Sequence, residues 1–296
     1  MLLLKSIIMG IVQGVTEFLP VSSSGHLAIF KYILDFKTET DTDPGMLFDI
    51  LLHVGTLIAI FAVYFKDIKE LIIEGCRLIA DLVMNLITWC KNLTSKEERR
   101  PYRKLIGSTN RKFVVLIILS TIPTGIIGVI GGDIVEVAAE TLIVPGICLL
   151  ITSMLLLIAD GINTGRKRIG GVTYTNSFVL GICQGVATLP GLSRSGTTIT
   201  ACLLSGFEKN LAVKYSFIMS IPAVLGAAVL ELKDIGKVSI SAGEWASYIV
   251  GMAVAAVVGY ICIKTMLVVV RKKKFKGFAI YCAIVGIIAI IGSFVK

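Results

Sequence analysis

Long hydrophobic runs alternate with short polar segments along this chain. Six of the runs are long enough to cross a bilayer, because a membrane-spanning helix needs roughly 20 apolar residues. They cover residues 46–65, 113–130, 142–159, 211–230, 245–270 and 278–295. The pattern predicts an all-α integral membrane protein with six transmembrane helices.

The segment 67–89 has a different pattern. Its charged residues recur every three or four positions along an otherwise apolar run and so form one stripe on a helix: Asp67, Glu70, Glu74, Arg77 and Asp81. Such a helix is expected to lie on the membrane surface. The residues that follow, 91–112, are charged and polar and contain Pro101 and Gly107, which predicts a solvated loop.

Two polar stretches resemble each other. Residues 13–26 read QGVTEFLPVSSSGH, and residues 184–198 read QGVATLPGLSRSGTT. Gln13 aligns with Gln184, Pro20 with Pro190, and residues 22–25 with 193–196. Because Pro and Gly interrupt helices, each stretch is predicted to form a re-entrant helical hairpin. The chain is then an inverted-topology repeat, with halves at 1–160 and 172–296.

The distribution of charge supports this arrangement. Basic clusters between 96 and 112, at 166–168 and at 271–274 favour the cytoplasmic side, whereas the acidic segments 35–43 and 133–140 favour the outside. The alternation holds only if residues 177–205 enter and leave on the cytoplasmic side. The alternative, in which both polar stretches are kinked transmembrane helices, would disturb it.

The composition agrees with a membrane protein and argues against nucleic-acid binding, a disulfide framework and a zinc site. The chain has 296 residues, 55% of them hydrophobic, with a mean hydropathy of +0.87. The net charge of +9 is concentrated in loops between apolar runs and indicates contact with membrane lipids, and no nucleic-acid-binding motif is present. Seven scattered cysteines favour neither a disulfide framework nor a zinc site. The N-terminus does not have the pattern of a cleaved signal peptide.

The first polar stretch contains groups suited to phosphate chemistry. Gln13 and Glu17 share one helix face and can hold a divalent cation or position a water molecule. The turn Ser22, Ser23, Ser24 and Gly25 offers hydroxyl and N–H groups to phosphate oxygens. His26 follows Ser23 by three residues and is a candidate base or acid. His53, with no such cluster in its neighbourhood, is interpreted as structural.

Arg194 is the most informative residue of the second stretch. A guanidinium binds phosphate through two parallel hydrogen bonds. Ser193, Ser195 and Thr197 surround it with further hydroxyl groups. An orientation-setting arginine at the membrane interface is the alternative. We expect the two stretches to meet in one phosphate-handling site.

These motifs resemble those of the undecaprenyl-diphosphate phosphatases of the bacitracin-resistance type. The first family motif has Glu or Gln, then Glu four residues later, then Pro-Val-Ser-Ser-x-Gly-His, here Gln13, Glu17 and residues 20–26. The second, Pro-Gly-x-Ser-Arg-Ser-Gly, occurs at residues 190–196. The resemblance covers essentially the whole chain.

The resemblance implies hydrolysis of undecaprenyl diphosphate to undecaprenyl phosphate, which recycles the lipid carrier for peptidoglycan synthesis and confers bacitracin resistance. It further implies a divalent cation (Mg or Ca), a site open to the outer side of the bacterial cytoplasmic membrane, and a fold with six spans and two re-entrant hairpins. Family members are often dimeric, so a homodimer is expected.

The resemblance also implies roles for individual residues. Glu17 and Gln13 serve the metal or water, Ser23 and His26 the nucleophile and proton transfer, and Arg194 with Ser193 and Ser195 the diphosphate. Many members carry a glutamate where this chain has Gln13, which weakens a metal site built on two carboxylates.

Two other functions are weighed against hydrolysis. Inverted repeats are also typical of transporters, so a flippase of the lipid carrier is one alternative. A pure carrier does not need the Glu, Ser and His cluster beside Arg194. The acid-phosphatase-like lipid phosphatases share the sequence Ser24-Gly25-His26 but need a second histidine after the Ser-Arg pair, and this chain has none there.

Overall fold

The computed structural model describes residues 1–34, 44–94, 99–139, 141–162, 165–231, 241–272 and 274–294. Within these ranges the chain is helical, with no β-strand beyond a single bridge between Lys167 and Phe207. The acidic segment 35–43, predicted to lie outside the membrane, falls outside the described residues.

The six predicted spans are all helices, with boundaries within a few residues of those expected. They are α3 (Pro44–Val63), α5 (Thr109–Ile130), α7 (Ile143–Gly161), α10 (Lys209–Glu231), α11 (Ala242–Arg271) and α12 (Lys276–Phe294). In the described part of the chain, five of these are long and apolar enough to cross a membrane alone, and α3 qualifies together with the helix that follows it. The protein is therefore an all-α, multi-pass membrane protein.

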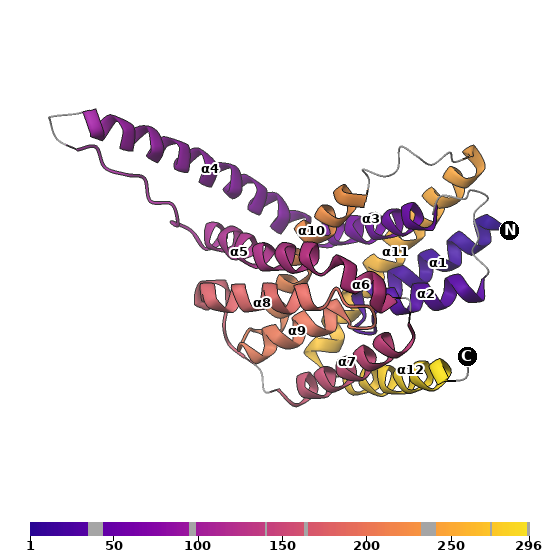
Figure 1. Ribbon diagram of the computed structural model, residues 1–296. Coiled ribbons are helices and arrows are strands. Elements are labelled where there is room, and N and C mark those ends of the chain that lie inside the picture. The colour runs from indigo at the N-terminus through magenta and orange to yellow at the C-terminus, as the bar shows by residue number, and fades with distance from the viewer. Residues whose placement is uncertain are drawn as a thin grey trace.

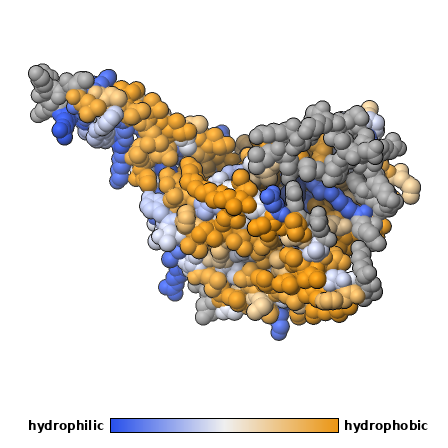
Figure 2. All heavy atoms as spheres, in the orientation of Figure 1, coloured by the Kyte–Doolittle hydropathy of each residue, from blue (hydrophilic) through white to orange (hydrophobic). Residues whose placement is uncertain are grey.

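The outer faces of these helices present apolar side chains, as expected for contact with lipid. Along α12, for example, Ile280, Ile284, Ile288 and Ile291 are all exposed. Figure 2 shows that hydrophobic residues cover most of the visible surface.

The long helix α4 (Phe65–Thr94) follows α3 after a bend of 90° and projects away from the other helices (Figure 1). It contains the predicted amphipathic segment 67–89 but is longer at both ends. The predicted loop 91–112 is partly wrong, because residues 91–94 continue α4 and residues 109–112 already belong to α5. The apolar spacing simply extends past the polar residues that suggested an end.

Residues 99–106 form an extended segment that returns along α4, and we call this segment the strap. The side-chain amide of Asn85 exchanges two hydrogen bonds with the backbone of Arg103, and the amide of Asn92 does the same with Arg100. Arg111 of α5 adds ion pairs of 2.8 Å with both Glu74 and Asp81. The polar stripe of α4 therefore faces protein groups.

The two polar stretches form helix–break–helix hairpins at the predicted positions. The first hairpin is α1 (Leu2–Phe18) and α2 (Ser23–Ile33), and the second is α8 (Tyr174–Val186) and α9 (Arg194–Leu204). With 11 to 13 residues, α2, α8 and α9 are roughly 16 to 20 Å long, shorter than the hydrocarbon core of about 30 Å. These lengths suit hairpins that do not cross the membrane. The inverted topology stays a prediction.

Each hairpin packs mainly on a helix from the other predicted half of the chain, α1 on α11 and α8 on α5. Small residues allow these close contacts. A Cβ atom on Gly10 would lie 2.4 Å from the carbonyl oxygen of Gly251, and one on Gly181 would lie 2.1 Å from that of Ser120. The α7–α12 pair closes one edge of the molecule (Figure 1), and the short α6 (Gly132–Ala139) and η1 (Ile169–Gly171) lie in connections.

Candidate functional site

The breaks of the two hairpins lie against each other, as the repeated motifs predict. A Cβ atom on Gly196 would lie 3.2 Å from the Cβ of Pro20, and the hydroxyl of Ser195 donates to the carbonyl of Leu19 over 3.4 Å. Gly25 faces Gly191 across the same junction, 4.0 Å from a Cβ position to a Cα atom. Residues about 170 positions apart in the chain thus share one site.

Glu17, in the last turn of α1, is the centre of this site. Its Oε1 accepts a hydrogen bond of 2.6 Å from Nη2 of Arg194. Its Oε2 accepts one of 2.7 Å from the hydroxyl of Ser23 and one of 3.2 Å from Nε2 of Gln13. The Glu17 side chain is 6% exposed and that of Arg194 is 19% exposed. A nearly buried carboxylate therefore links the predicted nucleophile to the predicted phosphate ligand.

Two helix N-termini point their positive ends at this site. Ser23 is the first residue of α2, and Arg194 is the first residue of α9. The N-cap Ser193 accepts a hydrogen bond of 3.1 Å from the backbone N–H of Gly196. The first N–H groups and the dipole of a helix attract anions. Together with the guanidinium, they make the junction a place for a phosphate group.

The backbone at both breaks is unusual. Ser22 has φ of 71°, a left-handed conformation that is strained for a residue with a side chain. Gly191 has φ of 87°, and a Cβ atom there would lie 2.2 Å from the carbonyl oxygen of Pro145. The second break thus requires glycine, while the first tolerates a strained serine beside the site.

His26 and Ser23 form hydrogen bonds with other residues, so the predicted proton transfer between them stays a prediction. Nδ1 of His26 donates to the carbonyl oxygen of Ser22 over 2.7 Å, since a carbonyl can only accept. Its Nε2 then accepts from the hydroxyl of Tyr281 in α12 over 2.5 Å, and the two rings stack with an interplanar angle of 16°. Glu17 is the group placed to take the proton of Ser23.

The structure adds two residues that the sequence did not indicate. Tyr281 is brought to His26 from 255 positions away. His53, interpreted above as structural, lies with its Nε2 4.0 Å from Oε2 of Glu17, while its Nδ1 donates to the carbonyl of Asp49. No motif surrounds either residue, so only the packing of α3 and α12 against the first hairpin reveals them.

The remaining predicted residues differ in accessibility. Ser24 is exposed, whereas Ser193, Ser195 and Thr197 are buried. Two buried polar atoms near the junction have no hydrogen-bond partner among the described residues: Oε1 of Gln13 and Oγ1 of Thr197. Since buried polar groups are normally paired, these two atoms are available to a ligand.

A divalent cation would find only a partial set of protein ligands. Within the described ranges, no three His, Cys, Asp or Glu side chains are arranged to hold a metal ion. Glu17 and the unpartnered carbonyl oxygen of Gln13 supply oxygen ligands, the kind that Mg²⁺ and Ca²⁺ prefer. The two residues fit an ion whose other ligands come from the substrate and water.

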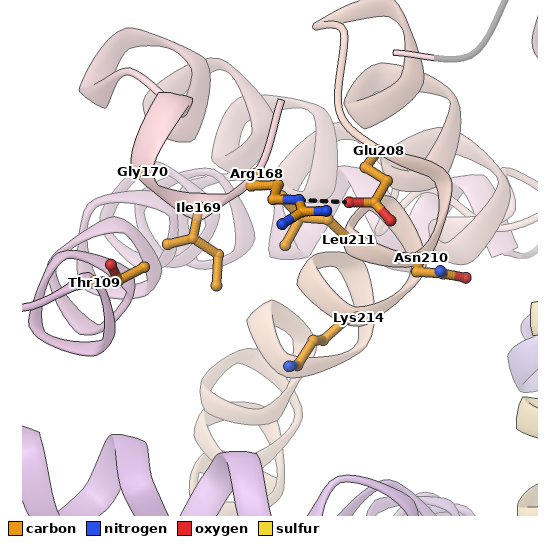
Figure 3. A pocket seen from close by; sticks show the side chains of 8 residues that line it. All are labelled: Thr109, Arg168, Ile169, Gly170, Glu208, Asn210, Leu211 and Lys214. Atoms are coloured by element: carbon orange, nitrogen blue, oxygen red, sulfur yellow. Dashed lines mark ion pairs between the residues drawn. The ribbon is translucent and has the colours of Figure 1, made fainter. Parts of the chain in front are cut away.

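An open pocket of about 440 Å³ lies elsewhere, where α5 and α10 begin (Figure 3). Its lining includes Arg168 and Lys214 but none of the predicted site residues. Arg168 pairs with Glu208 over 3.5 Å, and Lys214 pairs with Asp67. Both cations therefore have a carboxylate partner, and the pocket has no excess of positive charge from them.

Comparison with known proteins gives consistent results. A model of the family described as bacitracin resistance protein BacA matches residues 6–288. The undecaprenyl-diphosphatase of Alkaliphilus metalliredigens is 40% identical over 98% of both chains. That of Methanosphaera stadtmanae is 38% identical over 99% of both chains, and that of Halothermothrix orenii is 36% identical over 97% of this chain and 96% of its own.

Proposed function

Because the chain belongs to the bacitracin resistance protein BacA family, we propose that it hydrolyses undecaprenyl diphosphate to undecaprenyl phosphate and inorganic phosphate. The observation that carries this proposal is the bridge made by Glu17 between Ser23 and Arg194. It joins a hydroxyl, a proton acceptor and a phosphate ligand in one site. The product returns to cell-wall synthesis as a lipid carrier, and its supply underlies bacitracin resistance.

Arg194 and the two helix N-termini bind the diphosphate. In the structure, Nη2 of Arg194 is hydrogen-bonded to Glu17, but a guanidinium has five N–H donors in a planar fork. Its other donors can bind phosphate oxygens while Glu17 holds the plane in place. Phosphoryl transfer spreads negative charge over the transferred oxygens, so fixed positive charge in a nearly buried site lowers the barrier.

Ser23 and Glu17 carry out the bond exchange. The Ser23 hydroxyl attacks the terminal phosphorus, its proton passes to Glu17, and the phosphoanhydride bond breaks. Undecaprenyl phosphate leaves with the electron pair of that bond. Glu17 gives its proton to the oxygen of the leaving undecaprenyl phosphate. Water then attacks the phosphorus of the phosphoserine and passes a proton to Glu17. The bond between phosphorus and the Ser23 oxygen breaks, Glu17 returns the proton to that oxygen, and inorganic phosphate departs.

This covalent route is testable against direct attack by water. With substrate labelled on the terminal phosphate, rapid acid quenching is expected to trap label on Ser23. A protein that turns over at the normal rate but never carries label would show that Ser23 only orients the water.

His26 holds the turn that presents Ser23. Its hydrogen bond to the carbonyl of Ser22 supports the strained residue just before Ser23, and Tyr281 fixes the ring from the other side. The hydrogen bonds of the two ring nitrogens select the tautomer with the proton on Nδ1. This arrangement favours a positioning role for His26.

Glu17 and Gln13 would hold a divalent cation, Mg²⁺ or Ca²⁺, which would supply positive charge to offset the negative charge of the diphosphate. Chelator is expected to abolish phosphate release and also to weaken binding of a non-hydrolysable diphosphate analogue. Turnover and binding that both survive exhaustive chelation would contradict a metal requirement.

We place the protein in the bacterial cytoplasmic membrane with the site open to the outer side. The basic loops support this orientation. Ser24 is exposed near the site, so a Ser24→Cys protein in a cysteine-free background should react with a membrane-impermeant thiol reagent added outside cells. Labelling only after the cells are opened would show that the site opens to the cytoplasm.

The activity itself is tested by phosphate release from undecaprenyl diphosphate by the purified protein. Release that stops in Glu17→Ala supports the proposal. Binding of the lipid without release of phosphate would instead favour the flippase.

A further inference from the structure

Helix α4 carries an apolar face that no described part of the protein covers. Its exposed residues recur at intervals that place them on one side of the helix: Ile72, Ile79, Val83, Leu86, Trp89 and Leu93. At 30 residues the helix is about 45 Å long, and it projects beyond the bundle (Figure 1). Hydrophobic residues lie along most of its visible length (Figure 2). A face of this length needs an apolar environment.

The opposite side of α4 is occupied by protein. Glu74 and Asp81 pair with Arg111, and Asp67 pairs with Lys214 of α10. Glu70 accepts a hydrogen bond of 2.8 Å from Asn110. The acidic groups of α4 are therefore turned toward the protein, and Asp67, Glu74 and Asp81 are paired with cations there, which reduces the repulsion of a negatively charged partner on the other side.

Positive charge remains around the apolar face. Residues 65–108 contain nine Lys and Arg against six Asp and Glu. Lys66 and Lys69 are exposed on the flank of α4, and the ion pairs of this helix with described residues involve neither of them. The strap lies on the other side of α4, where Arg103 pairs with Asp81 and the backbone bonds to Asn85. Lys66 and Lys69 are thus the exposed cations beside the apolar face, within about one Debye length of whatever covers it.

From these observations we propose that the apolar face of α4 is seated in the interface of an anionic phospholipid bilayer, with Lys66 and Lys69 on its flank attracting the headgroups. The 90° bend after α3 directs the helix away from the axis of that neighbouring span. An apolar face bordered by cations is the pattern of an interfacial helix, and each cation near such a surface contributes to its affinity. The contact is separate from the phosphatase site, which contains no residue of α4.

Trp89 makes this contact measurable. The chain has two tryptophans, so a Trp245→Phe protein reports from the apolar face of α4 alone. The full chain is reconstituted into vesicles whose phosphatidylcholine carries brominated acyl chains, with or without phosphatidylglycerol. We expect the bromines to quench Trp89, about twofold more strongly when phosphatidylglycerol is present. A Trp89→Phe protein, which keeps Trp245, should show no such dependence on phosphatidylglycerol.

The contribution of charge is tested by Lys66→Gln with Lys69→Gln. This double substitution should remove most of the difference in Trp89 quenching between vesicles with and without phosphatidylglycerol. The matched control is Lys272→Gln with Lys274→Gln, which removes the same charge from exposed positions after α11. In this control the difference in Trp89 quenching should remain. Phosphate release is expected to stay normal in both, so a failure here is distinct from a failure of the proposed hydrolysis.

Three results would overturn the proposal. Trp89 that is not quenched in any vesicle would mean that α4 does not enter the bilayer. Equal quenching with and without phosphatidylglycerol would remove the role of anionic lipid. If Trp89 is protected from quenching by the brominated lipids and two copies can be crosslinked through α4, the apolar face instead binds a second copy of the chain.

Discussion

The helix after the break begins with Ser23 in the first hairpin and with Arg194 in the second. By the alignment of the two stretches, these are equivalent positions. The first hairpin also supplies a carboxylate at Glu17, where the second has Thr188, whose hydroxyl bonds to the carbonyl of Gly185 within its own hairpin. In the proposed mechanism, one copy of the motif holds the reacting groups and the other holds the phosphate ligand. The comparison teaches that two similar stretches contribute different chemical groups to one site.

The polar groups of the second hairpin mostly bind other protein groups. Nε2 of Gln184 donates to the hydroxyl of Thr124 and to the carbonyl of Met219, and Thr198 bonds to Ser216. Gln13, the equivalent of Gln184, donates to the reactive carboxylate instead. The equivalent glutamines of the two hairpins therefore have different partners: Gln184 binds groups outside its hairpin, whereas Gln13 binds Glu17.

Among the substitutions that test this division of roles, removal of the Ser23 hydroxyl should lower activity most. We expect Ser23→Ala to lower kcat/KM for phosphate release about a thousandfold, roughly 4 kcal/mol, because the nucleophile is lost. Ser24→Ala removes an exposed hydroxyl next to it and is the matched control, with a change of less than about tenfold. Equal losses in the two variants would contradict the assignment.

Changing Arg194 to Lys tests whether the second hairpin supplies charge alone. Lysine keeps the positive charge but loses the planar fork that binds phosphate and Glu17 together. The expected loss in kcat/KM is about a hundredfold, roughly 2.7 kcal/mol. Arg168→Lys, at the exposed pocket of Figure 3, should be neutral. Full activity in Arg194→Lys would show that this position needs only a positive charge and not the planar guanidinium.

Stability should distinguish the glycines of the two breaks. Gly191→Ala is expected to cost about 2 kcal/mol of unfolding free energy, since φ is positive there and the added Cβ meets the carbonyl of Pro145. At Gly25 the nearest neighbour of an added Cβ atom would be the hydroxyl oxygen of Ser22, 3.8 Å away, so Gly25→Ala should change stability little. Thermal unfolding in detergent compares the two, and equal shifts in Tm would show that the breaks are equivalent.

The smallest effect is expected for Tyr281→Phe. It removes one hydrogen bond to His26 while keeping the stacked ring, so a loss of about tenfold or less in kcat is expected, with KM unchanged. The pH profile should also change, because Nε2 of His26 loses its hydrogen-bond donor and is freer to bind a proton. Tyr260→Phe on α11 is the control. An unchanged rate and pH profile would mean that Tyr281 only packs against His26.

Much of this architecture could be predicted from the sequence. Apolar runs located the six spans because burial in lipid requires them, and the duplicated motif predicted that Glu17 and Arg194 meet. His53 and Tyr281 could not be predicted, since they reach the site through helix packing and no local pattern marks them. The separate hydrogen bonds of Ser23 and His26 could not be predicted for a related reason. Spacing of three residues places side chains on one helix face, but Ser23 is the first residue of its helix and turns back toward α1.

The contacts of α4 show a second limit. The charge stripe correctly predicted an amphipathic helix, but not that Asn85 and Asn92 bind the backbone of the strap. Such contacts between a helix and a non-helical segment leave no periodic signal in the sequence.

The most direct test of a site shared between the hairpins is a double-mutant cycle on Glu17 and Arg194. Phosphate release is measured for Glu17→Gln, Arg194→Gln and the double variant. If the two side chains act as one unit, the double variant should be little worse than either single variant, with a coupling energy of about 2 kcal/mol or more. Losses that simply multiply would show that the hairpins act independently and would contradict the account.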